Sequence, residues 1–507
     1  MRNVRGVLAA ACVVLVGAFV AGCSSGGAAR SDDGVVRVGV HPVSSMDPRK
    51  SGPIDTIYLT PVFDALIKRT ADGSLEPGLA TEWTLAADGT SFDLTLRAGV
   101  TFQDGSPMDA EAVKANILSA KEPGNARASN LSPVSGVTVV DPTHVRLELS
   151  EPAGQLEGVL ASEAGMMMSP ASLTDPAAAT EPIGAGPYRV EKYSQDEIRY
   201  VTWDGYWNAG QVKNKELVYV MNPDSTTQFR ALQSGQIDMY NLPQEMRDAA
   251  EQAGLEVVSG PTGRIWQLTL NTGEEHLANP EVRKAVSLAL DRSALAQAAF
   301  GGTDRCVPTV QPFAREFVGH VDALDEQLKP DLAQATELLA QAGYPGGFPL
   351  RLVTANSSQQ QAIAQIVQAE LAKIGITVEL EVSDQAEATR KSRAGDFDLQ
   401  VNLIMAPRPD PTQYVVDMYL PGGVYNPGDY SQPGVPELLE QARASTDPEK
   451  QQAALGEIVT SVYEAGAPTA PLCVNAQIYA FPDNVDGFEV PVLGDFDFTQ
   501  VTTSATP

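Results

Sequence analysis

The sequence has few histidines and few basic residues for its length of 507. No two of the four histidines (His41, His144, His276 and His320) are three or four positions apart, so we expect no preformed histidine metal site. Lys and Arg number 35 against 64 Asp and Glu, which gives a formal net charge of −29. Because phosphate binding needs clustered basic side chains, this balance argues against nucleic acid as a partner.

Motifs of the common catalytic sites are also missing. No GxxxxGK[ST] phosphate loop occurs, so the chain is not expected to be an ATPase. Gly184-Ala185-Gly186 lacks the third glycine of a dinucleotide fingerprint, and no GxSxG elbow occurs within residues 35–507. We interpret acidic residues such as Asp64 and Glu82 as surface or capping groups. These absences predict a protein with no enzymatic activity and no cofactor.

The N-terminus is typical of an exported lipoprotein. An arginine-containing start precedes the apolar run Val7–Val20, which is too short to span a bilayer. Small residues then lead to Cys23, as in the bacterial lipobox, whose cysteine is acylated. We expect a signal peptide at 1–22 and a lipidated Cys23 at the start of a flexible tether, 23–34. The alternative is an ordinary secretory signal with an incidental cysteine.

Only four cysteines occur, and two of them remain unexplained by the N-terminal signal. Cys12 leaves with the signal peptide, and Cys23 is the expected lipid site. Cys306 and Cys473 could form a disulfide in an oxidising compartment, although sequence alone does not establish the pairing. No CxxC spacing indicates zinc or redox chemistry.

The pattern of apolar residues predicts a mixed α/β chain. Alternation predicts strands, and recurrence every three or four positions predicts helices. A strand, helix and strand in succession near residues 350–382 indicate a right-handed βαβ crossover. The predicted elements are strands at 35–40, 350–353, 376–382 and 397–406, a hairpin at 83–96, and helices at 110–119, from 279, and at 359–374.

Short motifs in a fixed order give a more specific signal. They are Pro77–Trp83 (PGLATEW), Leu96–Phe102 (LRAGVTF), Gly184–Tyr188 (GAGPY), Ala231–Asp238 (ALQSGQID), Val282–Ala285 (VRKA) and Leu338–Tyr344 (LLAQAGY). Their order and spacing over about 35–490 resemble the extracytoplasmic solute-binding proteins of the dipeptide, oligopeptide and nickel ABC importers, solute-binding protein family 5.

The resemblance implies an α/β fold with two lobes, the class II type of periplasmic-binding-protein fold. The ligand is expected in the cleft between the lobes. Lobe I is expected at 35–265, with an extra subdomain at about 55–180. Lobe II is expected at 266–475, and residues 476–507 are expected to return to lobe I and form the C-terminal tail. Closure of such a cleft removes water from the solute and gives the importer two shapes to distinguish.

The implied function is that of an extracytoplasmic binding lipoprotein of an ABC importer. It would capture a peptide or peptide-like solute and deliver it to the permease. We expect a monomer that is anchored to the outer face of the cell membrane only by lipid. The alternatives are a binding protein for a metal chelate or an oligosaccharide, and a secreted enzyme or non-transport lipoprotein on the same scaffold.

Candidate ligand-binding residues come from segments that face the ligand in this family. One segment follows the first strand, one follows the strand at 397–406, and one lies near the hinge. Each residue has a structural alternative: Met405 could be core, Trp266 hinge packing and Arg408 a solvated loop residue. The expected residues are Ser45, Met46, Trp266, Met405, Ala406 and Arg408, and no metal ligand is expected.

One departure from the family concerns the α-amine of a peptide. Peptide binders place an acidic residue shortly before an Asp-Pro step. Here Asp410-Pro411 is present, but the stretch before it is Ala406-Pro407-Arg408. Arg suits a carboxylate and would repel an ammonium. We therefore expect that a peptide ligand is not held by its α-amine at this position, unless an acid from another loop substitutes.

Overall fold

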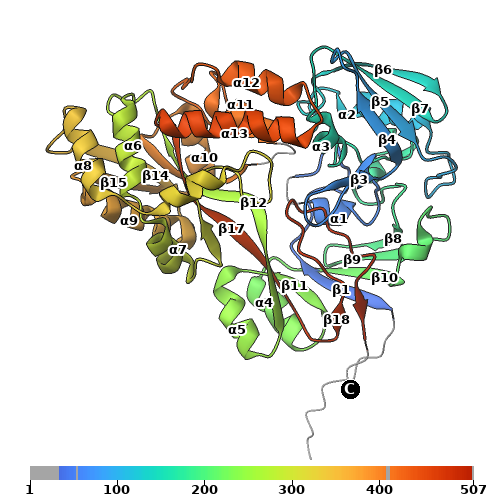
Figure 1. Ribbon diagram of the computed structural model, residues 1–507. Helices are drawn as coiled ribbons and strands as arrows, with labels where there is room; N and C mark the ends of the chain where they lie inside the picture. Colours follow the sequence, from blue (N-terminus) through green and yellow to red (C-terminus); the bar gives the residue numbers. More distant parts are fainter. Residues whose placement is uncertain (1–33, 53–54, 407–410, 505–507) are drawn as a thin grey trace, which may run out of the picture.

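The computed structural model describes residues 34–52, 55–406 and 411–504. These residues form two lobes that are joined by long strands (Figure 1). The mixed α/β, two-lobed architecture expected from the sequence is confirmed. The expected signal peptide, Cys23, most of the tether and Arg408 lie outside the described residues.

One sheet of eleven strands runs through both lobes. Two long antiparallel strands at its centre cross from one lobe to the other, so the hinge is built from the sheet itself. Off this path, β13 (Cys306–Pro308) pairs with β17. In sheet order the strands are β15 (Thr377–Ser383), β14 (Pro349–Ala355), β16 (Leu399–Met405), β12 (Glu256–Leu270), β17 (Thr469–Phe481), β11 (Met239–Leu242), β1 (Val35–Val40), β10 (Glu216–Met221), β9 (Glu197–Thr202) and β8 (Tyr188–Tyr193).

Lobe II packs helices against the part of this sheet that contains β14, β15 and β16. The predicted crossover is confirmed: β14 and β15 pair in parallel and are connected by α9 (Ser358–Ala372). Asn279 caps α6 by accepting a hydrogen bond from the Glu281 amide. The other helices are α6 (Pro280–Ala289), α7 (Arg292–Phe300), α8 (Leu332–Gln341), α10 (Gln385–Ala394), α11 (Pro411–Tyr419), α12 (Val435–Arg443) and α13 (Pro448–Glu464).

Lobe I carries a second sheet of four antiparallel strands beside its share of the long sheet. The predicted hairpin and the helix after Asp109 are confirmed, and the Asp109 carboxylate caps that helix. The sheet order is β4 (Ala80–Leu85), β5 (Ser91–Leu96), β7 (His144–Leu149) and β6 (Val134–Asp141). The remaining elements are α1 (Thr56–Leu59), α2 (Ala110–Ala120), α3 (Leu156–Leu160), α4 (Ser225–Gln233), α5 (Arg247–Gln252), β2 (Ile67–Arg69), β3 (Leu75–Pro77), β18 (Val485–Asp486) and β19 (Thr502–Thr503).

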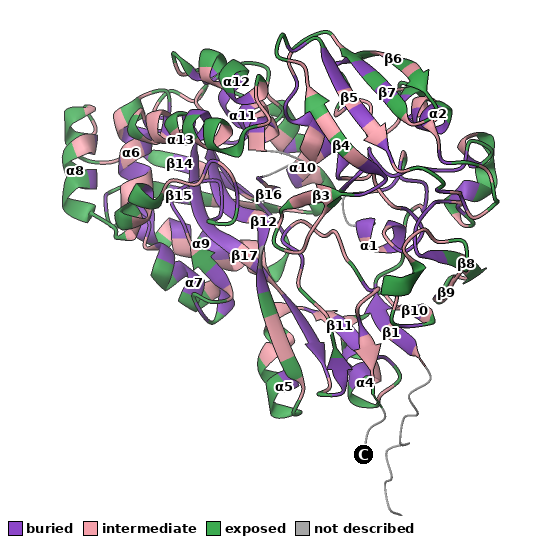
Figure 2. Cartoon of the chain, turned by 45° about the vertical axis from the view of Figure 1, so that its right-hand side comes forward, coloured by how far each residue is buried: buried purple, intermediate pink, exposed green. Residues whose placement is uncertain are grey.

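Each lobe has its own hydrophobic core. One cluster around Leu268, Val286 and Leu352 fills lobe II, and a separate cluster around Phe92 and Leu147 fills the four-stranded subdomain. Figure 2 shows buried residues along the strands and exposed residues on the outer faces of the helices. These two clusters share no residue, whereas a further cluster around Ile404 and Val415 of lobe II also includes Val492 of the C-terminal segment. Within the described residues, no helix is both long and apolar enough to cross a membrane.

Candidate functional site

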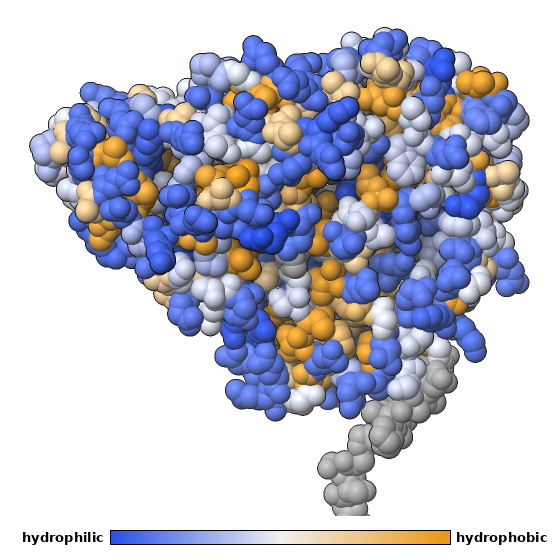
Figure 3. Space-filling view, in the orientation of Figure 1, coloured by the Kyte–Doolittle hydropathy of each residue, from blue (hydrophilic) through white to orange (hydrophobic). Residues whose placement is uncertain are grey.

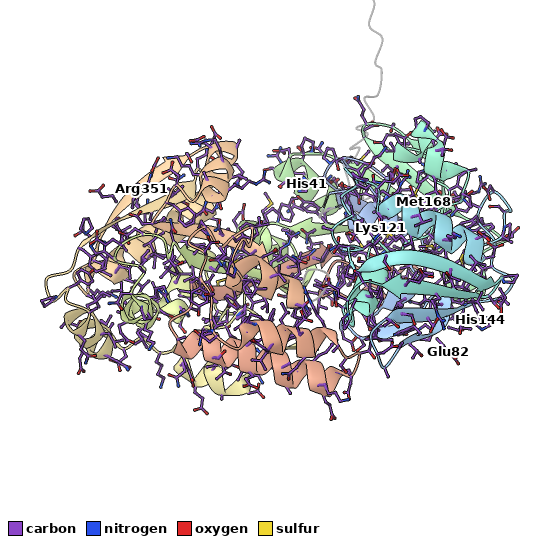
Figure 4. The ribbon with its side chains drawn as sticks, turned by 90° about the horizontal axis from the view of Figure 1, so that it is seen from above. His41, Glu82, Lys121, His144, Met168 and Arg351 are labelled. Atoms are coloured by element: carbon purple, nitrogen blue, oxygen red, sulfur yellow. A yellow bond between two sulfur atoms is a disulfide. The ribbon has the colours of Figure 1, made fainter. Side chains whose placement is uncertain are left out.

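A cavity of about 410 Å³ lies where the two lobes meet. Figure 3 shows hydrophilic residues over most of this face of the molecule and apolar residues gathered near its middle, and Figure 4 places His41 between the lobes. The walls come from the end of β1, from the crossing strands and from the segment between β18 and β19. They include residues 39–42, 55–58, 240–244, 262, 264, 405, 475–479 and 492–494.

A bulge in the crossing strand β12 shapes one wall of this cavity. The pairing of β12 with β17 jumps from Pro261↔Ala476 to Ile265↔Val474, so residues 262–264 lie opposite the single residue Asn475. Polar contacts fix the bulge, because the Thr262 hydroxyl donates to the Asn475 carbonyl at 2.7 Å and accepts from the Arg264 amide at 3.1 Å. Bulges re-aim side chains, and here the bulge brings Arg264 to the cavity wall.

Arg264 has no counter-charge in the part of the chain that the structure describes, where its guanidinium makes no hydrogen bond or ion pair. Burial lowers its pKa from the ordinary value. Asp55 lines the same cavity, but its carboxylate accepts hydrogen bonds from the Gly52 amide at 2.7 Å and from the Ser44 hydroxyl. The cavity wall therefore offers a partly desolvated cation that no described residue pairs, and a solute can supply its partner.

Gln244 adds an acceptor to the same cavity. Its side-chain amide donates to the Ala476 carbonyl at 2.7 Å, which fixes the orientation of the group. Its Oε1 is buried and has no partner within the described structure. A buried acceptor without a donor costs about 1–3 kcal/mol, so a ligand that donates a hydrogen bond here gains that energy.

The crossing strands are tied together beside the cavity. Cys306 of β13 and Cys473 of β17 form a disulfide with a Cα–Cα distance of 5.3 Å, and both residues are fully buried. Trp266 on β12 packs against Phe300, with ring centroids 6.1 Å apart, and donates to Asn475 Oδ1 at 3.3 Å. These contacts fix β17 to β13 and β12 to α7, and the Trp266–Asn475 bond links the two crossing strands where they leave lobe II.

The lobes also touch at a second place, away from the crossing strands. The Gly154 amide, just before α3 of lobe I, donates to the Arg443 carbonyl at the end of α12 in lobe II at 2.6 Å. A Cβ atom at position 154 would lie 2.2 Å from the Ser445 carbonyl oxygen, so the approach requires glycine. We call this pair of segments, Gly154 and 443–445, the distal contact.

The structure brings only part of the expected site residues to the cavity. Met405 lines it. Met46 is fully buried in the core of lobe I, because its segment folds inward and its amide bonds to the Ala179 carbonyl. Ala406 is 1% exposed and Trp266 is 7% exposed, and both pack in lobe II. The Ser45 hydroxyl accepts from the Asp47 amide in a local turn.

Asp64 is not the surface or capping group expected from the sequence, because it lines a cavity inside lobe I. Asp64 accepts a hydrogen bond from Trp207 Nε1 at 2.6 Å, and burial raises its pKa to about 6. It lines a cavity of about 430 Å³ inside lobe I, where Lys68 pairs with Asp497 and Arg69 with Asp495. The cations of this cavity are thus neutralised within the protein. Glu82 is exposed, as expected (Figure 4).

One cluster of a histidine and two aspartates has the composition of a metal site. The ligand atoms of His320, Asp322 and Asp325 lie within 4.8 Å of one another. Arg315 donates to Asp322 at 2.7 Å and to Asp325 at 2.6 Å, so one cation already engages both carboxylates and offsets one of their two negative charges. We therefore assign no metal to this cluster.

Sequence reasoning missed Arg264 and Gln244. Pro261 and Gly263 interrupt the strand just before Trp266, and a strand glycine often marks a bulge. This signal was available for Arg264. Gln244 follows a strand end and carries no signal of its own, because only the tertiary fold brings it to the cavity.

Comparisons with known proteins agree with this geometry. Residues 74–426 match the family model of bacterial extracellular solute-binding proteins, family 5. The glutathione-binding protein GsiB of Shigella dysenteriae is 27% identical over 512 residues, which cover 96% of each chain. The structure of AgaA from A. tumefaciens R10 in complex with agropinic acid is 26% identical, with a TM-score of 0.75 over 93% of this chain and 99% of that one. CtaP of Listeria monocytogenes, an ABC transporter substrate-binding protein, shares the fold, with a TM-score of 0.83 at 21% identity over 94% of this chain and 100% of that one.

Proposed function

Because the chain belongs to the bacterial extracellular solute-binding proteins, family 5, we propose that it captures a peptide or peptide-like solute between its lobes for an ABC importer. Proteins of this family bind small solutes outside the cytoplasm and work with ABC permeases. The observation that supports the choice of site is the cavity at the hinge, whose walls come from both lobes. Closure around a solute there changes the angle between the lobes, which a permease can sense.

Two features support a peptide-like solute. The relative from Shigella dysenteriae is named for glutathione binding, and a solved neighbour, DppA of Helicobacter pylori, holds the peptide STSA. The walls of the cavity mix apolar side chains such as Ile57 and Leu493 with polar groups such as Asn241 and Gln477. Such a lining suits a solute with a polar backbone and apolar side chains.

A melting screen of the mature protein with peptides, metal chelates and oligosaccharides tests this proposal. A solute at a hundredfold excess over its Kd adds about 2.7 kcal/mol of stability. Met405→Trp, which fills the cavity, should abolish the shift, whereas Asp64→Asn in the cavity of lobe I should leave it unchanged. If the melting temperature rises only with chelates or oligosaccharides, the solute belongs to that class and not to the peptides. If no solute raises the melting temperature, the proposed function is contradicted.

We further propose that Cys23 is lipidated and holds a monomer at the outer face of the membrane. Several acyl chains hold a protein durably, whereas one holds it weakly. Cys23→Ala should release the protein into the medium, as measured by immunoblotting of washed cells and supernatant. Cys12→Ala is the matched control, and it should stay with the cells. Retention of the Cys23→Ala variant after washing would contradict the anchor.

A further inference from the structure

We propose that Arg264 is the specificity-determining residue of the cleft and that it binds a carboxylate group of the solute. This inference rests on the proposed function, because it names the solute class of the same site. Two observations carry it: the bulge that brings Arg264 to the cavity wall, and the absence of a counter-charge in the described part of the chain.

The unpaired guanidinium of Arg264 carries an energetic cost. Enclosing a cation without a partner is costly, and proteins either pair such a group or bond it to carbonyl oxygens. Arg292 in lobe II shows the second solution, because its guanidinium donates to the carbonyls of Pro471 and Ser287 at 2.7 and 3.0 Å. Arg264 has neither solution within the described residues, so an anionic solute supplies the missing acceptor.

A guanidinium presents two parallel N–H groups that match the two oxygens of a carboxylate. A phosphate group carries up to two charges and is commonly bound by several basic groups or by a helix N-terminus. Among the described lining residues of the cavity, Arg264 is the one Lys or Arg, and His41 is the one other basic side chain. A single carboxylate balances this charge better than a phosphate does.

Gln244 lines the same cavity, and its buried Oε1 has no partner within the described residues, so it can accept from a donor. Asp55, the carboxylate on the described wall, accepts hydrogen bonds from the Gly52 amide and from the amide and hydroxyl of Ser44, which hold it in place. The site thus favours a solute with a carboxylate and a neutral N–H or O–H donor, such as the acid end of an acylated amino acid or peptide. This agrees with the lack of an acid before Asp410-Pro411 in the sequence.

The test uses matched solute pairs and three forms of the mature protein. The probes are tripeptides as free acids, the same tripeptides as C-terminal amides, and phosphoserine, measured by thermal shift and calorimetry. In the wild type we expect free acids to bind at least tenfold more tightly than their amides, and phosphoserine to bind no better than a free acid. Arg264→Met should abolish the preference, and Arg264→Lys should retain part of it.

A second measurement separates specificity from a structural role. Without solute, Arg264→Met should melt at the same temperature as the wild type or higher, because it removes an uncompensated buried cation. Arg292→Met is the matched control, and it should melt clearly lower, because it leaves carbonyl groups without donors.

The outcomes are distinguishable from those of the proposed function. If amides bind as well as acids, if Arg264→Met keeps the preference, or if that variant melts far below the wild type, the role of Arg264 is overturned and solute capture stands. If phosphoserine alone binds through Arg264, the anion is a phosphate and the carboxylate assignment is wrong. If no solute of any panel binds, both proposals fail.

Discussion

Burial shifts the pKa of arginines in lobe II and of carboxylates in lobe I. Lobe II encloses two arginines, Arg283 and Arg292, which are 6% and 2% exposed and donate to backbone carbonyls. Lobe I encloses the carboxylates of Asp64, Glu157 and Asp495, whose pKa values are raised by burial to about 6, 7 and 6.

The consequence of this difference is a different response to pH. Burial lowers the pKa of Arg292 only to about 10, so this group stays charged at any neutral pH. The acids of lobe I change charge in the folded protein between about pH 5 and 8, inside the range that an extracytoplasmic protein meets. The bonds of Arg292 therefore do not titrate near neutral pH, whereas the stability that these acids contribute to lobe I depends on the pH of the medium. Four changes test this contrast.

Removing the disulfide of lobe II should have the largest effect. The bond closes a chain segment of 167 residues, and a loop of this length loses much entropy in the unfolded state. The double variant Cys306→Ala, Cys473→Ala should lose about 4 kcal/mol of unfolding free energy in urea titrations. A reductant should shift the wild type and leave the double variant unchanged. Equal stability of the two proteins would show that lobe II does not depend on this bond.

The next effect concerns the buried arginine. Arg292→Leu removes the donors for the Pro471, Ser287 and Leu290 carbonyls and for the Ser287 hydroxyl. Each buried acceptor left without a donor costs about 1–3 kcal/mol, and the relief of enclosing a charge offsets part of this. We expect a loss of about 3 kcal/mol that does not change between pH 5 and 8. The control Arg315→Leu, at an exposed pair, should cost less than about 1 kcal/mol.

Sequence reasoning reached the fold more easily than the site. Strands and helices such as β1, α2 and α9 follow from local periodicity and capping residues, which a single sequence displays. The site depends on which residues the crossing strands bring together. Arg264 reaches the cavity only through a bulge whose polar contacts come from Asn475, more than 200 residues later. Met46, by contrast, follows the first strand as expected, but its local turn directs it into the core.

A smaller effect should come from lobe I and should depend on pH. The Glu157 carboxylate accepts from Trp83 Nε1 at 2.8 Å, and burial raises its pKa to about 7. A raised pKa in the folded state means that its stabilising contribution is complete below the unfolded pKa of about 4.3 and is lost as the pH rises through about 7. Glu157→Gln keeps an acceptor for Trp83 and cannot ionise.

We therefore expect Glu157→Gln to melt like the wild type at pH 4.5 and to be more stable by about 1 kcal/mol at pH 8, since solvent screens a partly buried group. Melting curves across this range measure the difference. Glu82→Gln, at an exposed position of the neighbouring sheet, should show no such trend. If the difference in stability between Glu157→Gln and the wild type is the same at both pH values, ionisation of Glu157 does not make the stability of lobe I depend on pH.

The smallest effect on stability should come from the distal contact, where the two lobes meet. Gly154→Val places a side chain against the Ser445 carbonyl, which lies 2.2 Å from the expected Cβ atom. Gly154 has no positive φ, so lobe I can accept the new residue without backbone strain. The clash arises only when the lobes approach, and the equilibrium should therefore shift towards separated lobes.

Small-angle scattering should then report a larger radius of gyration for Gly154→Val, with little change in melting temperature. Gly210→Val is the matched control in lobe I, because no atom lies within 4 Å of its expected Cβ. If the shift reduces the closed population tenfold, the apparent affinity for a solute falls about tenfold, since only the closed form encloses it. An unchanged radius together with a lower melting temperature would mean that the lobes pack as one body rather than as two.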